Sequence, residues 1–156
     1  MKPLPHHYAV RLVGGTSGHA LAAADGIPEL RTAPPLDFDG PGDAWSPEHL
    51  LLAAVETCFL FTLRAVAKAS GIEFETCNVA AEGTVDRVDG VTRFIDIVLR
   101  ARLKLAPGTS RDRALRATEK AEHACLVSAS LAAPIRLEAE ILQGVSAPLQ
   151  SASASI

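Results

Sequence analysis

The stretch from Ser46 to Gly71 reads SPEHLLLAAVETCFLFTLRAVAKASG and decides the fold. Serine is a good N-cap, and proline suits the first helical position because its missing N–H would be unpaired there anyway. Glu48 then places a negative charge near the positive end of the helix dipole. Gly71 provides the C-terminal stop. The sequence therefore predicts one long helix from about Pro47 to Ser70.

The apolar residues of this helix point in nearly every direction around its axis. This pattern is typical of a helix that protein encloses on all sides. Glu56 interrupts the apolar run and Arg64 ends it, so the run is shorter than the roughly 20 apolar residues that a membrane span needs. We expect a buried central helix rather than a membrane anchor. The apolar residues are Leu50, Leu51, Leu52, Val55, Phe59, Leu60, Phe61, Leu63 and Val66.

On both sides of this helix, the sequence alternates in the manner of strands. Glycines at 14–18 and the proline–glycine segment 34–43 favour loops. Residues 88–90 suit a tight hairpin turn. The expected strands are Tyr8–Val13, His19–Ala24, Glu29–Thr32, Ile72–Arg87, Thr92–Leu105 and 135–141, and the expected further helices are Thr109 or Ser110 to Ala124 and Leu126–Leu131.

The order of these elements, with no internal repeat and no domain linker, favours a single α+β domain over residues 1–156. We expect its core to span about 8–142 and residues 144–156 to form a flexible tail. The chain is 48% hydrophobic, but 27 of its residues are alanine and only 4% are aromatic. Because small side chains bury little apolar area, this core is thin for one protomer and favours a partner chain.

Charge and cysteine content exclude several classes of function. The net charge is −3 with no basic stripe, which argues against nucleic-acid binding. The three cysteines form no CxxC pair, and the first residues lack the apolar core of a signal peptide. We therefore expect a cytoplasmic protein whose thiols begin reduced. His49 and His123 lack metal-ligand spacing with the cysteines, so no metal site is predicted.

The residues alone leave the role of the cysteines open. Free cysteine is among the most buried residue types, so Cys58, Cys77 and Cys125 can each be small core residues. An apolar setting raises a thiol's pKa unless a donor or a cation stabilises the thiolate. Glu48 precedes Cys58 by ten residues, about 15 Å along a helix axis, so the two cannot touch within one straight helix. A shared site would need a second chain or a bend.

Two cysteine-containing segments resemble the OsmC/Ohr family, the osmotically inducible protein C and organic hydroperoxide resistance proteins. The segment 46–58 is similar to that family's PE-x-L-x-x-A-x-x-x-C motif, and the segment 123–131 is similar to its second motif, a cysteine followed three residues later by serine. Gly71-Ile72, Gly83 and the segment 38–42 fit as well. The resemblance covers roughly residues 8–142.

The resemblance implies an OsmC-like fold, with antiparallel sheets around a long buried central helix, in an intertwined homodimer. It also implies a cysteine-based peroxidase with peroxiredoxin-type chemistry. Cys58 would attack an organic hydroperoxide and become a sulfenic acid, and Cys125 would resolve it to a disulfide. No bound cofactor is implied, because an external thiol or a dithiol such as a lipoyl group would reduce that disulfide. Glu48 matches the family's active-site glutamate, which pairs with a thiolate-stabilising arginine.

The sequence departs from the family at that arginine. The organic hydroperoxide resistance proteins of the family carry it in the glycine-rich turn after the first strand, where this chain has the segment 14–18 followed by His19. Arg31 is the first candidate to replace it, with Glu48 holding the guanidinium, and His19 is the second. This departure favours the OsmC branch or a more divergent one. Two alternatives to a peroxidase are a catalytically weak protein that binds an apolar ligand and a redox sensor that uses the disulfide as a switch.

Overall fold

The computed structural model describes residues 2–144. The chain forms two compact units, and the boundary between them in the sequence falls between Leu51 and Leu52. The first unit holds a small sheet, and the second holds a larger sheet with its helices. The expected flexible tail lies outside the described residues, apart from Gly144. A Cβ built on Gly144 would come within 2.3 Å of the Leu105 carbonyl oxygen, so this position packs closely against the chain.

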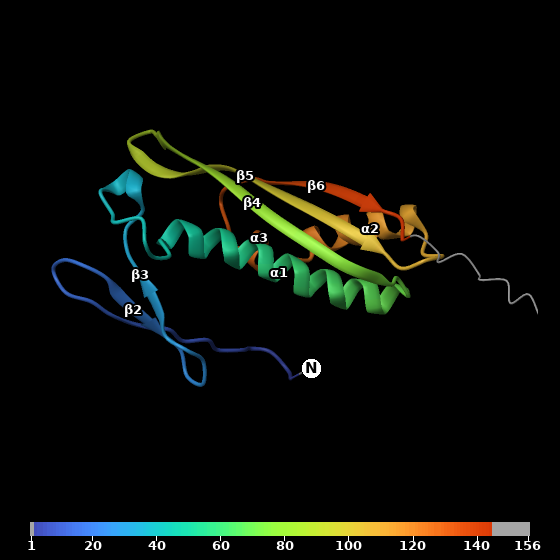
Figure 1. The fold of residues 1–156 in the computed structure, drawn as a ribbon, viewed down its shortest axis with the longest axis horizontal. Coiled ribbons are helices and arrows are strands. Elements are labelled where there is room, and N and C mark those ends of the chain that lie inside the picture. The colour runs from blue at the N-terminus through green and yellow to red at the C-terminus, as the bar shows by residue number, and fades with distance from the viewer. Residues whose placement is uncertain (1, 145–156) are drawn as a thin grey trace, which may run out of the picture. The chain divides into compact units, whose positions relative to one another are not determined.

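The first unit contains a three-stranded antiparallel sheet in the order β1-β2-β3. Its strands are β1 (Arg11–Val13), β2 (Ala20–Ala23) and β3 (Leu30–Thr32), followed by the 3-10 turn η1 (Leu36–Phe38). All three strands are present as predicted but shorter, because pairing covers only three residues between each pair of neighbours. Figure 1 shows β2 and β3 side by side in this unit.

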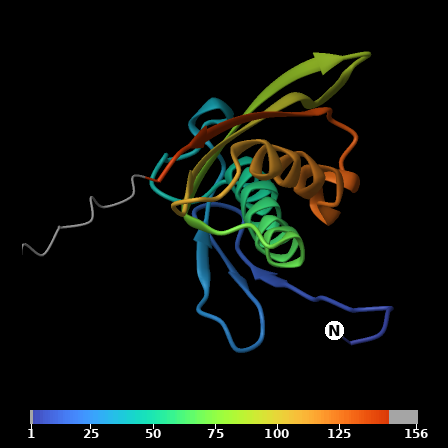
Figure 2. The same ribbon diagram turned by 90° about the vertical axis from the view of Figure 1, so that its right-hand side faces the viewer.

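The second unit is a three-stranded sheet in the order β4-β5-β6, with helices packed against it. Figures 1 and 2 show the long α1 and the shorter α2 on the same side of this sheet. The elements are α1 (Pro47–Ser70), whose residues up to Leu51 belong to the first unit, and β4 (Phe74–Val88), β5 (Val91–Leu105), α2 (Arg111–His123), α3 (Leu126–Ala129) and β6 (Ile135–Leu142).

The predicted hairpin is confirmed as β4 and β5, which pair antiparallel over almost their whole length. Asp89 and Gly90 connect them with φ angles of 51° and 80°. Two successive positive φ angles match the right-handed twist of the strands, and aspartate followed by glycine tolerates them.

The sheet of the second unit is mixed, which corrects the expectation of purely antiparallel sheets. β6 pairs parallel with β5, from Ile97 opposite Ile135 to Lys104 opposite Leu142. Between the two strands the chain passes through α2 and α3. A parallel pair needs such a crossover, and this connection is long enough to supply it.

The ends of α1 are those that the sequence predicts. Ser46 Oγ accepts the backbone N–H of His49 at 3.3 Å, which caps the N-terminus. At the other end, Gly71 has a φ of 61°, and the Ile72 N–H donates to the Ala67 carbonyl at 2.9 Å. A left-handed residue after the last turn lets the chain satisfy the free carbonyls of the helix.

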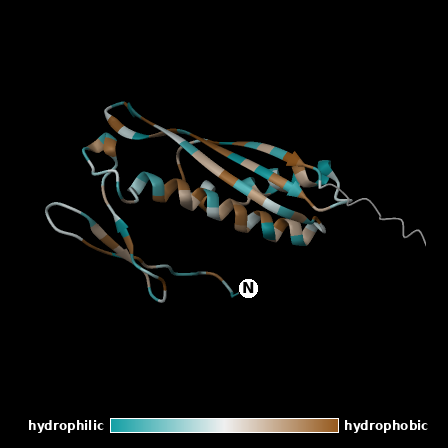
Figure 3. Ribbon diagram, viewed as in Figure 1, coloured by the Kyte–Doolittle hydropathy of each residue, from teal (hydrophilic) through white to brown (hydrophobic). Residues whose placement is uncertain are grey.

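One side of α1 is buried within the single chain, and the enclosure of its other side stays a prediction because it concerns a partner chain. Val55, Phe59, Leu63 and Ala67 recur every four residues and are buried, whereas Phe61 is 58% exposed. Apolar and polar colours alternate along α1 in Figure 3. By length and composition α1 could cross a membrane, but its buried residues belong to the hydrophobic core. It is therefore a core helix.

The hydrophobic core of the second unit joins α1, the sheet and α2. Alternate residues of β5 point into it, as the sequence predicts, and α2 adds three small residues. The fully buried core side chains are Val55, Phe59, Leu63, Leu99, Leu103, Leu105, Ala114 and Ala121.

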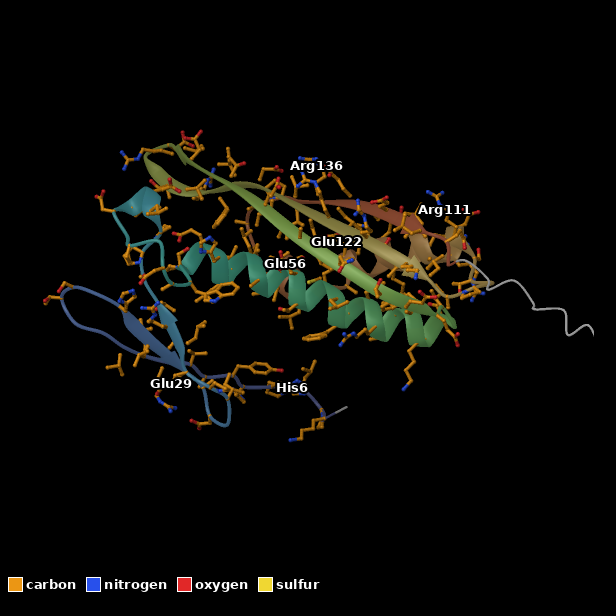
Figure 4. The ribbon with its side chains drawn as sticks, viewed as in Figure 1. His6, Glu29, Glu56, Arg111, Glu122 and Arg136 are labelled. Atoms are coloured by element: carbon orange, nitrogen blue, oxygen red, sulfur yellow. The ribbon has the colours of Figure 1, made fainter. Side chains whose placement is uncertain are left out.

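The other face of this sheet is polar. Arg100 and Arg102 on β5 pair with Glu138 and Glu140 on β6 at 2.9 and 2.6 Å, in register across the parallel strands. Arg136, labelled in Figure 4, pairs with Asp96 at 3.3 Å. Exposed pairs of this kind stabilise a protein little, by about 0–1 kcal/mol each, but they keep the face solvated.

Candidate functional site

The two cysteines of the predicted site come together in the second unit. Cys58 lies in the middle of α1 and is partly exposed. Cys125 is fully buried and occupies the N-cap position of α3, between the end of α2 and the first turn of α3. Both are free thiols.

The thiols of Cys58 and Cys125 lie close enough for each to shift the pKa of the other. Sixty-seven positions separate them in sequence, and the crossover through β4, β5 and α2 returns the chain to α1. Two neighbouring sulfur atoms meet the first requirement for a disulfide, since the bond needs closely placed Cβ atoms.

The Cys58 pKa is lowered from its ordinary value. Burial acts to raise it, but the hydrogen bonds that the sulfur accepts outweigh burial. These come first from the Val127 backbone N–H, then from the Cys125 thiol, the Thr62 hydroxyl and the Leu126 backbone N–H. Donors to the charged form favour the thiolate. The first turn of α3 thus stabilises the Cys58 thiolate, a role that the sequence analysis assigned to an arginine.

The Cys125 pKa is raised. Burial is the main cause, and the neighbouring Cys58 adds to it, while the hydroxyl and backbone N–H of Ser128 oppose it. The pKa shifts of the two cysteines therefore have opposite signs, as expected if Cys58 reacts first and Cys125 second. Cys58 is the better nucleophile in the resting state, because the thiolate is the reactive form.

The third cysteine, Cys77, lies on β4 and packs against the hydrophobic core. Burial raises its pKa, and the Arg64 guanidinium opposes this only partly. An inert core thiol fits these observations, in agreement with the sequence interpretation.

Glu48 belongs to the first unit and occupies the first turn of α1. Its Oε2 is buried, and among residues 2–144 it has no hydrogen-bond partner. Glu48 also lines a mostly apolar cavity of about 460 Å³ with Pro34, Pro35 and Phe38. A carboxylate oxygen left unpaired in such a setting is costly and therefore calls for a partner in the working protein.

A reciprocal pair of contacts fixes the turn that carries Glu48. Ser46 Oγ caps the His49 N–H, and His49 Nδ1 in turn accepts the Ser46 backbone N–H at 3.3 Å. This is the arrangement of a capping box, with histidine at the third helical position where glutamate or glutamine is usual. The Trp45 indole packs edge-on against the His49 ring, with the ring centroids 6.3 Å apart. Glu48 thus lies in a turn that is fixed at both ends, by Ser46 and by His49.

Arg31 on β3 binds the loop that precedes α1. Its guanidinium donates to the Asp43 carbonyl at 2.7 Å and to Asp43 Oδ2 at 3.3 Å. His19 Nε2 lies 2.7 Å from Asp43 Oδ1, and the hydrogen bond from His19, helped by Arg31, lowers the Asp43 pKa. Within the first unit, the recorded carboxylate partner of Arg31 is therefore Asp43 rather than Glu48.

Sequence reasoning missed several groups that this site uses. Thr62 follows Cys58 by four residues, so helical spacing alone could have placed its hydroxyl beside the sulfur. The N–H groups of Leu126 and Val127 carry no side-chain signal. Only the fold shows that α3 begins next to α1. Asp43 lies in a loop whose conformation the sequence does not predict, so its contacts with Arg31 and His19 were not expected.

Comparison with known proteins identifies relatives of this chain. Residues 40–140 match the family described as OsmC-like protein. The chain is 33% identical over 109 residues to YmaD of Bacillus subtilis, an uncharacterized protein, covering 68% of this chain and 73% of the relative.

Solved structures share the fold. An OsmC-like protein of unknown function from Vibrio cholerae superposes with a TM-score of 0.79 at 16% identity, covering 86% of this chain and 99% of the other. An organic hydroperoxide resistance protein from Elizabethkingia anophelis superposes with a TM-score of 0.72 at 25% identity, covering 92% and 100%. With the family match and the identity to YmaD, these likenesses lead to one conclusion: the chain belongs to the OsmC/Ohr family of OsmC-like proteins.

Proposed function

We propose that this protein is a thiol-dependent peroxidase that reduces organic hydroperoxides. The observation that carries the proposal is the contact between Cys58 and Cys125 at the start of α3, where backbone N–H groups favour the Cys58 thiolate. Lowered thiol pKa values at partly exposed positions are characteristic of reactive cysteines.

The reaction begins when the Cys58 thiolate attacks the terminal oxygen of the hydroperoxide. The O–O bond breaks, the alkoxide that leaves takes a proton from the solvent and departs as an alcohol, and Cys58 is oxidised to a sulfenic acid. Cys125 then attacks the Cys58 sulfur, which forms the Cys58–Cys125 disulfide and releases water. An external thiol or dithiol, such as a lipoyl group, reduces the disulfide by exchange, so no bound cofactor is needed.

Glu48 and Arg31 are the two charged groups that we assign to the same chemistry. In this proposal, two copies of the chain form a homodimer, and Arg31 exchanges its Asp43 contacts for Glu48 and the Cys58 thiolate. A planar guanidinium can bind a carboxylate and face a thiolate at once. The apolar cavity beside Glu48 suits the organic part of a hydroperoxide rather than hydrogen peroxide itself.

Names of relatives support the substrate class and a role in the oxidative stress response. Two proteins of the same fold are called organic hydroperoxide resistance proteins, one from Legionella pneumophila and the one from Elizabethkingia anophelis. The proposal includes a cytoplasmic location, because thiols in that compartment are kept reduced.

A thiol count tests the function directly. We expect one equivalent of cumene hydroperoxide to remove two free thiols per chain and to leave Cys77 reduced. Cys58→Ser should abolish consumption, whereas Cys125→Ser should permit one round and leave a sulfenic acid that dimedone traps. Equal reactivity of the two variants would refute these roles. No thiol loss in the unmodified protein would favour the ligand-binding alternative, and disulfide formation without turnover by thiols would favour the sensor.

The role of Arg31 has its own test, in the Cys77→Ser, Cys125→Ser background. Arg31→Met should move the alkylation midpoint of Cys58 to higher pH, because an opposite charge near a thiolate lowers its pKa. Arg11→Met is the matched control, since Arg11 makes a similar exposed ion pair with Asp25 in the same sheet, at 2.7 Å. An unchanged midpoint would show that Arg31 only anchors the loop, and His19→Gln would then be tested in the same way.

A further inference from the structure

Ser128 is a buried polar group that the proposed reaction has not yet used. It lies on α3, three residues after Cys125. Its Oγ is buried, and within residues 2–144 it makes no hydrogen bond of ordinary geometry. A buried hydroxyl without a partner is energetically costly, so its presence calls for an explanation.

Other hydroxyl groups on nearby helices are satisfied by the helix backbone. Ser130 Oγ donates to the Leu126 carbonyl at 2.8 Å, and Thr118 Oγ1 donates to the Leu115 carbonyl at 2.7 Å. This back-bonding is the usual solution for serine and threonine in helices. The Ser128 hydroxyl forms no such bond, and its proton is therefore free to be donated elsewhere.

Cys125 is the N-cap of α3 and Ser128 is its third helical residue, the two positions whose side chains face each other in a capping box. This spacing brings the Ser128 hydroxyl to the Cys125 sulfur. Both the hydroxyl and the backbone N–H of Ser128 favour the negative form of that sulfur, against the effect of burial. Cys125 is fully buried, so water cannot take the place of these two donors. A neutral thiol is a weak acceptor, whereas a thiolate is a strong one, and hydrogen bonds to charged atoms are roughly twice as strong as neutral ones.

We propose that Ser128 Oγ donates a hydrogen bond to Cys125 Sγ when this sulfur becomes a thiolate, and that this bond drives the formation of the Cys58–Cys125 disulfide. The inference rests on the proposed peroxidase function and adds a donor that acts in its second step. Ser128 would stabilise the resolving thiolate, as the Leu126 and Val127 N–H groups stabilise the peroxidatic one.

Formation of the disulfide exchanges an S–O bond for an S–S bond. Cys125 gives up its proton and its sulfur attacks the Cys58 sulfenic sulfur, so that an S–S bond forms and the S–O bond breaks. The leaving hydroxide takes a proton and departs as water. Cys125 is oxidised and the Cys58 sulfur is reduced, and the oxidising equivalents come from the hydroperoxide consumed in the first step. Ser128 keeps its own proton throughout.

Single-turnover kinetics separate the two steps in a Cys77→Ser background. With Ser128→Ala we expect cumene hydroperoxide to be consumed at the unchanged rate, because Cys58 keeps its own donors. Disulfide formation should then slow by roughly tenfold or more, which is what loss of a hydrogen bond to a charged atom produces. Ser128→Thr, which keeps the hydroxyl, should restore most of the rate.

Ser130→Ala is the matched control, because it removes a hydroxyl from the same short segment that already bonds to the backbone. Equal slowing by Ser128→Ala and Ser130→Ala would overturn the proposal and indicate a general disturbance of α3. An unchanged rate of disulfide formation in Ser128→Ala would also overturn it.

A titration without peroxide distinguishes failure of this inference from failure of the function. In the Cys58→Ser, Cys77→Ser protein, the thiolate absorbance near 240 nm reports on Cys125 alone. Ser128→Ala should move its midpoint to higher pH, and Ser130→Ala should leave it in place. If the unmodified protein consumes no hydroperoxide but the midpoint moves, the peroxidase proposal fails and the Ser128 donor stands. An unmoved midpoint overturns the donor whatever the peroxide result.

Discussion

At the scale of single residues, the reactivity of Cys58 depends on hydrogen-bond donors contributed by two helices. Removing the backbone N–H groups of Val127 or Leu126 would require proline, which also constrains the backbone, whereas the Thr62 hydroxyl can be removed by a side-chain substitution alone. We predict that Thr62→Val raises the Cys58 pKa, because the thiolate loses a donor while the neutral thiol loses little. The rate of iodoacetamide alkylation should then need higher pH to reach its plateau.

Thr57→Val provides the comparison for this prediction. Thr57 is next to Cys58 on the same helix, but its hydroxyl donates to the Ala53 carbonyl at 2.7 Å. Its removal should leave the alkylation profile unchanged. Identical shifts in the two variants would mean that the Thr62 hydroxyl has no specific effect on the thiolate.

The candidate site was predictable from sequence only where side chains carry the chemistry. The pairing of Cys58 with Cys125 came from two motifs of a family resemblance, and the contact between the thiols agrees with it. The donors from α3 were not predictable, since every residue type except proline supplies the same N–H at 126 and 127. The unpaired Ser128 hydroxyl also depends on packing that a sequence pattern does not record.

At the scale of the elements, Glu56 connects α1 to the open edge of the larger sheet. Its Oε1 accepts the Ala81 backbone N–H of β4 at 2.7 Å, and Figure 4 shows Glu56 on α1 below that strand. We predict that Glu56→Ala lowers the free energy of unfolding by about 1–3 kcal/mol, because it leaves a strand N–H without its partner. Urea denaturation measures this loss.

Two further variants make the Glu56 result interpretable. Glu56→Gln keeps an acceptor oxygen and should cost much less than alanine. Glu82→Ala removes a carboxylate from the same strand that is 71% exposed and paired with Arg100, so its cost should stay within about 1 kcal/mol. A Glu56→Ala protein as stable as Glu82→Ala would show that the contact contributes little.

The elements themselves were mostly predictable, for identifiable reasons. α1 has strong signals at both ends, in Ser46 and Gly71, and its bounds were correct. The parallel pairing of β5 with β6 was missed, because alternation in a strand shows which face is buried but not which neighbour it joins. The strands of the first unit were predicted too long, since their exposed flanks alternate without pairing.

At the scale of the whole molecule, the exposed apolar surface of α1 indicates a partner. Phe61 is 58% exposed in the single chain, although the composition offers few aromatic residues. We predict an obligate homodimer by sedimentation at micromolar concentration, and Phe61→Glu should shift it toward monomer. Val91→Glu, which alters a residue 57% exposed at the tip of the β4–β5 hairpin, is the control. A stable folded monomer of the unmodified protein would refute the dimer.

Cys58 and Cys125 are close in space but far apart in sequence, and this has a consequence for the thermal stability of the oxidised protein. A bond between positions 58 and 125 would close a loop containing β4, β5 and α2, which removes much of the freedom of the unfolded chain. For a loop of this length, chain entropy alone predicts a gain of about 4 kcal/mol in stability. The oxidised protein should therefore melt at a higher temperature than the reduced one, and a calorimetric scan could report which form accumulates in the cell.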